Sequence, residues 1–347
     1  PGEFTKRAFL NGRIDLAQAE AVIDVITSKT DMGLDAALNQ LKGELSKEIK
    51  GIMDKLLSML AHIEASIDFP EHDVEEITVN RLNDMLISTG DAIEDLLESF
   101  EEGKIMKDGL STAIIGRPNV GKSSLLNLLL KENRAIVTEI PGTTRDIIEE
   151  YLNVGGIPIR LIDTAGIRES VDIVERLGVE RTKSAIIDSD LVILVLDASN
   201  KLSGDDNDII DLIKSKKVIA VLNKIDLGLD IEDQYLYDLF GADNVIKMSV
   251  KNRMGLDKLE ERIKGLVFHG KLNVSKNNLV TGIRHKRLLE KALESIKGAV
   301  LSIENQIPVD LISVDIKEAW TSLGAITGDT VGEDIVNEIF SKFCIGK

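Results

Sequence analysis

The sequence predicts an α/β domain with a mostly parallel sheet, inserted between the two halves of an all-α helical-bundle domain. Apolar residues recur at helical spacing over long stretches at both ends of the 347-residue chain. Between these stretches, short apolar runs alternate with helix-like segments, which is typical of a parallel sheet covered on both faces. Each helical half leaves an apolar stripe that the other half can cover. Two separate helical hairpins are the alternative architecture.

The first helical half contains two predicted helices. Apolar residues from Leu34 to Ile67 recur about every 3.7 positions, close to the ~3.6 residues of an α-helical turn. Phe69-Pro70 ends this helix, because proline cannot continue the hydrogen-bond ladder and restricts the residue before it. A second helix follows over 79–100, and Glu101-Glu102-Gly103 is expected to end it.

The middle of the chain, after Gly109, has the pattern of a sheet. The predicted strands cover residues 112–115, 159–162, 191–196, 218–222 and 244–248. From about Val280 helical periodicity returns, with predicted helices over 288–300, 311–326 and 335–343. We therefore divide the chain into 1–109 (the end of an N-terminal domain and the first helical half), 110–268 (the α/β domain) and 269–347 (the second helical half with its C-terminal tail).

Composition limits the kinds of protein that this chain can be. Hydrophobic residues make up 43% and charged residues 29%, as in soluble globular proteins. The 42 basic and 59 acidic residues give a net charge of −17, which argues against strong non-specific binding to nucleic acid or anionic membranes. A single cysteine fits a reducing compartment, so we expect a cytoplasmic protein. No apolar run approaches the ~18–20 residues of a membrane span, and Pro1 in place of Met indicates a piece of a longer chain.

Residues 116–123, Gly-Arg-Pro-Asn-Val-Gly-Lys-Ser, form a phosphate-binding loop between the first predicted strand and a helix. The glycines let backbone N–H groups turn inward around phosphates, and the helix N-terminus adds a favourable dipole. Lys122 is expected to reach the β- and γ-phosphates, and the Ser123 hydroxyl to bind Mg²⁺. The residues of this loop predicted to contact the nucleotide are Asn119, Val120, Gly121, Lys122, Ser123 and Ser124.

Three further motifs follow the ends of predicted strands. In Asp163-Thr164-Ala165-Gly166 the carboxylate can hold Mg²⁺ and the last amide can sense the γ-phosphate. In Asn223-Lys224-Ile225-Asp226 the Asp226 carboxylate can accept hydrogen bonds from guanine N1–H and N2–H₂. Such pairing can reject an analogue by ~10⁴–10⁵, so GTP and GDP are favoured over adenine nucleotides. Ser249-Val250-Lys251 is expected to close over the base. The four motifs together predict a Ras-like P-loop GTPase domain.

The segment 138–146, Thr-Glu-Ile-Pro-Gly-Thr-Thr-Arg-Asp, lies between the phosphate loop and the Asp163 motif. A threonine of such a loop completes the Mg²⁺ shell when GTP is bound, and we assign this role to Thr144. The Pro141-Gly142 pair also fits a type II turn.

Hydrolysis needs a group other than a glutamine, because Ile167 stands where Ras-like enzymes place the glutamine that orients the attacking water. The side-chain oxygen of Asn119 can coordinate a monovalent cation beside the phosphates. Such a cation would supply the transition-state charge that an arginine finger supplies elsewhere. Glu169 and Glu175 are candidate acids, although such residues are more often solvated surface charges.

These features together resemble the MnmE (TrmE) family of tRNA-modification GTPases. The motifs that carry the resemblance are the loop at 116–119, Pro-Gly-Thr-Thr-Arg-Asp at 141–146, Asp-Thr-Ala-Gly-Ile-Arg-Glu at 163–169 and the ending Phe-Cys-Ile-Gly-Lys at 343–347. Residues 1–12 resemble the point where that family's N-terminal domain leads into the helical domain. The similarity covers the whole chain and implies that most of the N-terminal folate-binding and dimerisation domain is absent.

The resemblance implies roles for individual residues. It implies a nucleotide- and K⁺-binding loop that orders when two G domains meet, formed by Thr138, Glu139, Ile140, Pro141, Gly142, Thr143 and Thr144. Asn119, Thr138, Ile140 and Thr143 would bind K⁺, and Ser123 and Thr144 would bind Mg²⁺. Glu175, ahead of Glu169, would position the hydrolytic water through a second water. Cys344 would serve the tRNA-modifying chemistry, and Arg13 and Lys347 would line a 5-formyltetrahydrofolate pocket that is incomplete in this chain.

The resemblance also implies partners. The family works with an FAD-dependent protein, MnmG, to install an aminomethyl or carboxymethylaminomethyl group at C5 of the wobble uridine of certain tRNAs, with GTP hydrolysis driving conformational change. The full-length form would be a homodimer. Given the net charge of −17, we expect the partner to make most of the tRNA contacts, although a basic stretch occurs at 284–287, where solvation of a helix face explains it equally well.

The residues leave two other functional hypotheses open. A ribosome-assembly G protein that uses GTP as a binding switch shares the phosphate loop and the apolar residue after Gly166, but such proteins usually carry a basic RNA-binding module that is not visible here. A helical stalk that transmits G-domain dimerisation mechanically overlaps with the tRNA-modification hypothesis.

Two single residues also have ordinary explanations. Val250 stands where alanine is common, and we expect little effect because its contact with the base uses the backbone. A lone cysteine such as Cys344 is usually a small buried hydrophobe.

Overall fold

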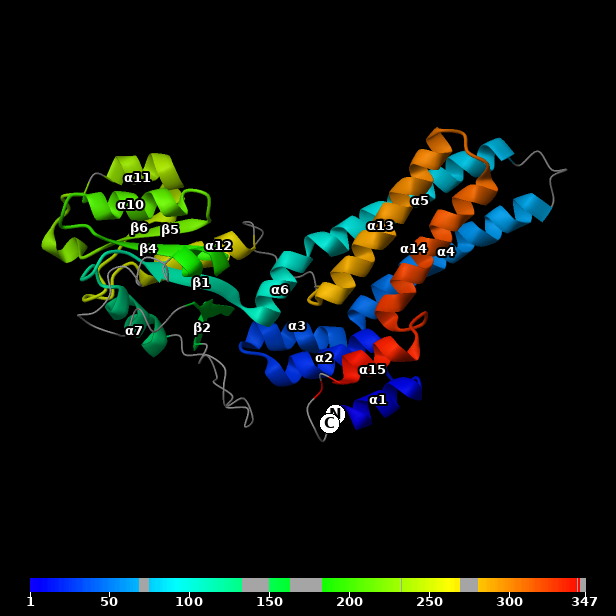
Figure 1. The fold of residues 1–347 in the computed structure, drawn as a ribbon, viewed down its shortest axis with the longest axis horizontal. Coiled ribbons are helices and arrows are strands. Elements are labelled where there is room, and N and C mark those ends of the chain that lie inside the picture. Colours follow the sequence, from blue (N-terminus) through cyan, green and yellow to red (C-terminus); the bar gives the residue numbers. More distant parts are fainter. Residues whose placement is uncertain are drawn as a thin grey trace. The chain divides into compact units, whose positions relative to one another are not determined.

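The computed structural model describes residues 1–68, 75–132, 150–162, 183–231, 233–268, 280–341 and 343. The chain separates into two compact units, one formed by residues 1–28, 33–104 and 274–347, and the other by 29–32 and 105–273. The first unit is helical, and the second is built on a six-stranded sheet (Figure 1). The helical unit is therefore made from both ends of the chain, with the α/β unit inserted between them, as the sequence predicts.

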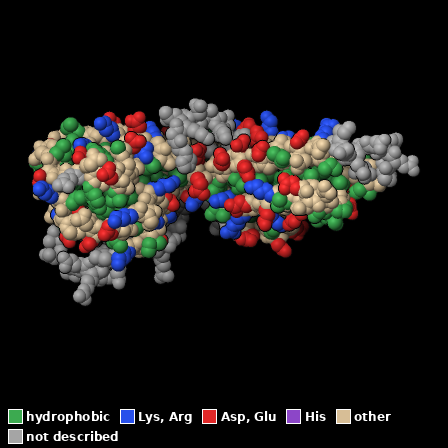
Figure 2. Space-filling view, turned by 90° about the horizontal axis from the view of Figure 1, so that it is seen from above, with side chains coloured by type: hydrophobic (Ala, Val, Ile, Leu, Met, Phe, Trp, Pro, Cys, Tyr) green, Lys and Arg blue, Asp and Glu red, His purple; other side chains and the backbone are tan. Residues whose placement is uncertain are grey.

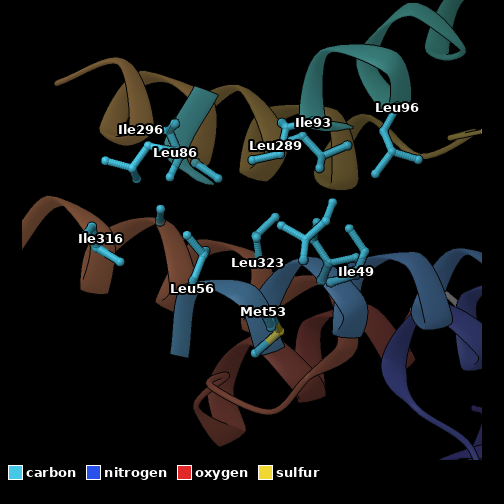
Figure 3. Packing of buried hydrophobic residues seen from close by; sticks show 14 of the residues in the cluster. Ile49, Met53, Leu56, Leu86, Ile93, Leu96, Leu289, Ile296, Ile316 and Leu323 are labelled. Atoms are coloured by element: carbon cyan, nitrogen blue, oxygen red, sulfur yellow. The ribbon is translucent and has the colours of Figure 1, made fainter. Parts of the chain in front are cut away.

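Four long helices form the core of the helical unit: α4 (Glu44–Asp68), α5 (Glu75–Glu98), α13 (Ile283–Glu304) and α14 (Val309–Thr327). In this bundle α4 packs against α14 and α5 packs against α13. Figure 3 shows their apolar side chains meeting, with Leu86 and Leu289 on one side and Leu56 and Leu323 on the other. Each fully buried side chain of this size contributes ~1.5–3 kcal/mol. The two halves share one core, so the alternative of two separate hairpins is wrong.

The predicted helix over 34–67 is interrupted. The structure has α3 (Asp31–Leu41), a break, and then α4. Gly43 takes the left-handed conformation (φ 87°) that commonly ends a helix, and the side chain of Gln18 donates to the carbonyl oxygen of Leu41 (2.9 Å). The apolar spacing continues across this break, which is why the pattern alone predicts a single helix.

The helix expected to end at Glu101-Glu102-Gly103 ends earlier, and another begins. Helix α5 stops at Glu98, and α6 (Phe100–Asp108) runs through all three residues. Phe100 is buried in the bundle core, and the Gly103 N–H donates to the Ser99 carbonyl oxygen (3.0 Å). The prediction of a stop at 101–103 is therefore wrong, because burial of Phe100 starts a new helix that the glycine does not break.

The two ends of the described chain meet in a second small core. Helices α1 (Glu3–Leu10), α2 (Leu16–Thr27) and α15 (Glu333–Ser341) contribute to it. Its members include Leu16, Phe340 and Phe343, and the rings of the two phenylalanines lie 4.8 Å apart. Asp15 begins α2 with a reciprocal capping box to Gln18. These contacts tie the first residues of the chain to α15, the last helix of the described residues.

Buried polar contacts fix the point where the chain returns to the helical unit. The N–H of Val280 donates to Oγ of Ser99 (3.1 Å), next to the place where the chain leaves through α6. Oγ1 of Thr281 donates to the buried side chain of Gln40 (3.0 Å). The exit and the return of the inserted segment are thus held side by side within the helical unit.

Glu20 of α2 binds two neighbouring side chains of α13. Its carboxylate accepts hydrogen bonds from Nε (3.0 Å) and Nη2 (2.9 Å) of Arg284 and lies 2.6 Å from Nε2 of the buried His285. Arg284 also donates to the carbonyl oxygens of Ala325 and Ile326 near the end of α14. Burial acts to raise the pKa of Glu20, but the hydrogen bonds from His285 and Arg284 outweigh it and lower the pKa to about 2.

The sheet of the α/β unit has the strand order β2-β3-β1-β4-β5-β6, with β2 antiparallel to β3 and the other pairs parallel. Its strands are β1 (Leu110–Ile115), β2 (Glu150–Val154), β3 (Ile157–Leu161), β4 (Leu191–Asp197), β5 (Val218–Asn223) and β6 (Val245–Lys247). The five predicted strands are confirmed. Strand β2 was missed, although Gly155-Gly156 between apolar residues, with both φ angles positive (60° and 96°), is a two-residue hairpin signal.

Helices and short 3₁₀ turns surround this sheet. The helices with described bounds are α7 (Lys122–Glu132), α10 (Gly204–Ile213), α11 (Asp233–Phe240) and α12 (Leu256–Val267), and the turns are η1 (Ile225–Leu227) and η2 (Ala242–Asn244). Strands β1, β4 and β5 are buried along their whole length. In the described part of the chain, none of the helices combines the length and apolar composition needed to cross a bilayer.

We expect Glu20→Gln to lower the free energy of unfolding by up to about 3 kcal/mol at pH 7, because the folded pKa of about 2 lies well below the ordinary glutamate value of 4.5. Folding depresses this pKa, so the contribution is complete above pH ~4.5 and is lost as the pH falls toward 2. Urea titrations of both proteins at pH 7 and pH 3.5 measure the difference, with exposed Glu64→Gln as the control. A difference of the same size at both pH values would contradict a role for the ionised carboxylate.

Candidate nucleotide-binding site

Polar residues gather where the parallel strands of the α/β unit end. The phosphate loop follows β1, Asp197 ends β4, Asn223 ends β5, and Ser249 is the second residue after β6. Because the carboxyl ends of parallel strands meet at one edge of the sheet, these segments come together there. Strand β3 ends at the same edge, and the predicted Asp163 motif comes directly after it, outside the described residues.

The phosphate loop has the backbone that its glycines predict. Asn119 (φ 66°) and Gly121 (φ 106°) both take positive φ angles. A Cβ on Gly116 would lie 2.3 Å from the carbonyl oxygen of Val195 in β4, and one on Gly121 would lie 2.2 Å from Nδ2 of Asn223. Larger residues at these two positions would push the loop away from its neighbouring strands.

Lys122 closes the phosphate loop. Its ammonium donates to the carbonyl oxygens of Gly116 and Arg117, both at 2.7 Å. Burial lowers the pKa of this lysine. The two hydrogen bonds hold the ammonium over the loop that the sequence assigns to phosphates. Ser123 and Ser124 are exposed in the first turn of α7.

Arg117 anchors the phosphate loop to α10. Its Nε lies 2.9 Å from Oδ1 of Asp206, whose side chain is almost fully buried. The other oxygen of Asp206 accepts hydrogen bonds from the N–H and hydroxyl of Ser203, the N-cap of α10. This ion pair links residues 89 positions apart, and no local pattern along the chain indicates it.

Asn223 joins the phosphate loop to the loop after β6. Its Nδ2 donates to the carbonyl oxygen of Val120 (2.8 Å), and its Oδ1 accepts from the N–H of Val250 (3.1 Å). The side chain is 3% exposed. Both ends of one buried amide are satisfied, so the asparagine of the base-reading motif also sets the distance between the two loops.

Asp226 faces solvent with part of its carboxylate already oriented. Its Oδ1 accepts a hydrogen bond from the hydroxyl of buried Ser249 (2.6 Å), which itself accepts from the N–H of Asn252 (3.2 Å). An ionised carboxylate has about four acceptor positions, so one hydroxyl leaves enough for two donors of a guanine edge. Val250 is half-buried beside it and Lys251 is exposed.

Lys224 is paired with a carboxylate that lies outside the predicted motifs. Its ammonium lies 2.7 Å from Oδ2 of Asp197, whose other oxygen accepts from Ser199. Burial acts to raise the pKa of Asp197, but the hydrogen bonds from Lys224 and Ser199 outweigh it and the pKa is lowered. The available signal was an aspartate at the end of the strand that precedes the base-reading strand.

Several predicted site residues lie outside the described residues. These are Thr138, Glu139, Ile140, Pro141, Gly142, Thr143, Thr144, Asp163, Thr164, Ala165, Gly166, Glu175, Cys344 and Lys347. Arg13 is described, and it is exposed between α1 and α2 of the helical unit. The structure therefore brings together the phosphate-loop residues and the two base-loop motifs, from residues 119–124, 223–226 and 249–251.

The basic stretch at 284–287 serves the fold of the helical unit. Arg284 pairs with Glu20, His285 is buried against it, and the ammonium of Lys286 lies 4.5 Å above the ring of Phe100. On the face shown in Figure 2, acidic and basic side chains are interspersed. Three of the four basic residues are thus used in contacts within the bundle.

Comparison with known proteins gives a consistent family. The model that matches residues 16–344 is described as the MnmE helical domain. A protein of Alkaliphilus metalliredigens (strain QYMF), named tRNA modification GTPase MnmE, is 55% identical over 346 residues, 100% of this chain and 75% of its own. A protein of the same name from Alkaliphilus oremlandii (strain OhILAs) is 52% identical over 347 residues, with the same two shares. The solved G domain of the T. maritima FeoB iron transporter is 27% identical and covers 45% of this chain and 96% of its own, at a TM-score of 0.33 that supports no inference.

We expect Asp226→Asn to exchange guanine for xanthine. Xanthine carries an oxygen at C2 where guanine carries an amino group. This oxygen can accept a hydrogen bond from the amide N–H of asparagine, whereas in the wild type it would face a carboxylate oxygen, which cannot donate. The affinity for GDP should fall at least about 100-fold, and the affinity for xanthosine diphosphate should rise.

Competition calorimetry with the two diphosphates measures this exchange. Asp243→Asn, an exposed substitution in η2 of the same unit, is the matched control and should change neither affinity. Unaltered preference for GDP in Asp226→Asn would show that this carboxylate does not read the base.

Proposed function

This chain belongs to the MnmE family of tRNA modification GTPases, and we propose that it is a K⁺-stimulated GTPase acting in C5 modification of the tRNA wobble uridine. As a member of that family it is a GTP hydrolase. The observation that supports the nucleotide assignment best is the Asn223 amide, which joins the phosphate loop to the loop after β6. The match covers all of this chain and 75% of the length of each of these relatives.

The phosphate contacts follow from the described loop. Lys122 would turn from the carbonyl oxygens that it now meets toward the β- and γ-phosphates, and the loop N–H groups would bind the phosphate oxygens. Ser123, exposed at the start of α7, fits the hydroxyl ligand of Mg²⁺. Thr144 would supply a second hydroxyl, and the carboxylate of Asp163 would help to hold the same ion. Mg²⁺ would neutralise charge on the β- and γ-phosphate oxygens.

Asn119 is the residue of this chain that would replace the missing glutamine and arginine. It is exposed at the bend of the phosphate loop, where its positive φ angle turns the chain beside the phosphate position. Its amide oxygen suits a monovalent cation, with Thr138, Ile140 and Thr143 completing the set. K⁺ bound there would offset the negative charge that develops on the phosphates in the transition state.

The remaining assignments concern water, thiol and folate. Glu175 would orient the attacking water through a second water. Cys344 would act in the modification of tRNA, and Arg13 and Lys347 would contact 5-formyltetrahydrofolate together with the N-terminal domain that the family resemblance implies. The exposure of Arg13 is compatible with this role.

The proposed setting is an assembly in the cytoplasm. The full-length protein would form a homodimer and work with the FAD-dependent MnmG, which would make most contacts to tRNA. Meeting of two G domains during hydrolysis would drive the conformational change. We keep 1–109, 110–268 and 269–347 as the proposed domain bounds. The relatives are named tRNA modification GTPases, which favours this proposal over the ribosome-assembly alternative.

We expect GTP turnover to be at least about 10-fold faster in KCl than in NaCl of the same ionic strength, because K⁺ at Asn119 stabilises transition-state charge. Asn119→Gly keeps the positive φ angle but removes the amide oxygen, so it should remove the difference between the salts. Exposed Asn127→Ala on α7 is the control and should retain it. Equal wild-type rates in both salts would refute the cation role of Asn119.

We expect Glu175→Ala and Cys344→Ser to separate hydrolysis from tRNA modification. Loss of Glu175 should lower kcat at least about 100-fold with little change in GTP affinity, as for a group that acts only in the transition state. Loss of the Cys344 thiol should leave kcat for GTP unchanged and abolish wobble-uridine modification by the full-length protein with its partner.

Single-turnover hydrolysis, nucleotide binding and mass analysis of tRNA nucleosides distinguish these outcomes. A large loss of nucleotide binding in Glu175→Ala would assign that residue to structure. Intact tRNA modification in Cys344→Ser would favour the hypothesis that the helical unit only transmits G-domain dimerisation mechanically.

A further inference from the structure

We infer that Asp197 is a positioning residue of the guanine site, which acts by holding the Lys224 ammonium and so fixing the loop that carries Asp226. This inference rests on the proposed binding of a guanine nucleotide. It assigns a function to a residue that lies on β4, a different strand from the one that precedes the base-reading motif.

The sheet brings Asp197 and Lys224 together. Strands β4 and β5 are parallel neighbours, and Asp197 pairs in register with Asn223, the residue before Lys224. The Ala198 N–H donates to the Asn223 carbonyl oxygen (2.8 Å), so the backbone contact continues beyond the strand. The lysine side chain then needs only to fold back along the sheet edge for its ammonium to reach Oδ2 of Asp197 at 2.7 Å.

Both oxygens of Asp197 are used within the protein. Oδ2 accepts from Lys224, and Oδ1 accepts from the N–H (3.1 Å) and the hydroxyl (2.6 Å) of Ser199. The Asp197 side chain is 10% exposed and that of Lys224 is 30% exposed. Three of its about four acceptor positions are thus used within the protein, so this carboxylate acts on a ligand through the lysine that it holds.

Asp197 and Ala198 close the segment 224–231, which carries Asp226, at both of its ends. At the start, the side chain of Asp197 holds Lys224, which is the N-cap of the turn η1 and whose φ of 66° is uncommon for a residue other than glycine. At the end, the carbonyl oxygen of Ala198 accepts from the N–H groups of Asp230 (2.9 Å) and Ile231 (3.3 Å). Asp226 lies in the segment between these two closures, so its position depends on them.

The ion pair also decides what Lys224 offers to a base. With its ammonium held at Asp197, the lysine presents its methylene stem in place of a mobile charge. An apolar stem suits the flat face of a purine, whereas Asp226 suits its edge. Loss of Asp197 should therefore weaken the base contacts more than the phosphate contacts, which the loop at 116–123 makes.

The test uses Asp197→Asn in the full-length protein. We expect the Kd for GDP to rise about 10-fold to 100-fold, the loss expected when a charge-assisted hydrogen bond is removed, while kcat at saturating GTP stays within about 2-fold. The preference for GDP over inosine diphosphate, which lacks the 2-amino group, should shrink because Asp226 is no longer held. Asp190→Asn, at the other end of β4 where its carboxylate accepts from the Ser111 N–H, is the matched control and should change none of these values.

Two further variants make the test specific. Lys224→Met keeps the length of the stem without the charge, and Asp197→Asn should add nothing to it if Asp197 acts through Lys224. Ser199→Ala retains the carboxylate and removes one donor, so it should raise the GDP Kd a few-fold, and it decides the question if Asp197→Asn does not fold. Unchanged GDP affinity and base preference in the folded variants, or fully additive effects with Lys224→Met, would overturn the inference. Failure of the wild-type protein to bind GDP would instead overturn the proposed function and this inference with it.

Discussion

The buried amide of Asn223 is the interaction on which the nucleotide site depends. It binds the carbonyl oxygen of Val120 and the N–H of Val250, groups that belong to loops 130 positions apart in the sequence. Leaving either group unpaired in a buried place would cost ~1–3 kcal/mol, so the two loops keep a fixed separation. A nucleotide that spans from phosphate to base meets a site whose two ends are already matched to one another.

The other polar contacts of the α/β unit extend the same design. Arg117 ties the phosphate loop to buried Asp206, Ser249 orients Asp226, and Asp197 holds Lys224. In each case a residue with a proposed role, or its neighbour in the motif, is held by a side chain from another element. Preorganisation of this kind lowers the entropy that binding costs, because few side chains remain to be ordered.

The helical unit solves a different problem, which is how to fold around an insertion. Its four long helices come from both sides of the inserted segment, and their apolar stripes cover one another. Contacts such as Ser99 with Val280 and Glu20 with Arg284 and His285 bring the later half into register with the earlier one. Apolar burial supplies the stabilisation, and these directional contacts determine which of several similar packings is adopted.

The amino-acid sequence by itself determined the fold class, the strands that carry the motifs and the chemistry of the phosphate and base loops. These features are local, because period, turn residues and motif spacing are properties of neighbouring residues. The break at Gly43, the start of α6 at Phe100 and the pairs Arg117–Asp206, Glu20–Arg284 and Asp197–Lys224 were decided only by the tertiary structure. They depend on which elements become neighbours, and the order β2-β3-β1-β4-β5-β6, like the pairing of the helices, follows from burial of the whole chain and leaves no mark in any one segment.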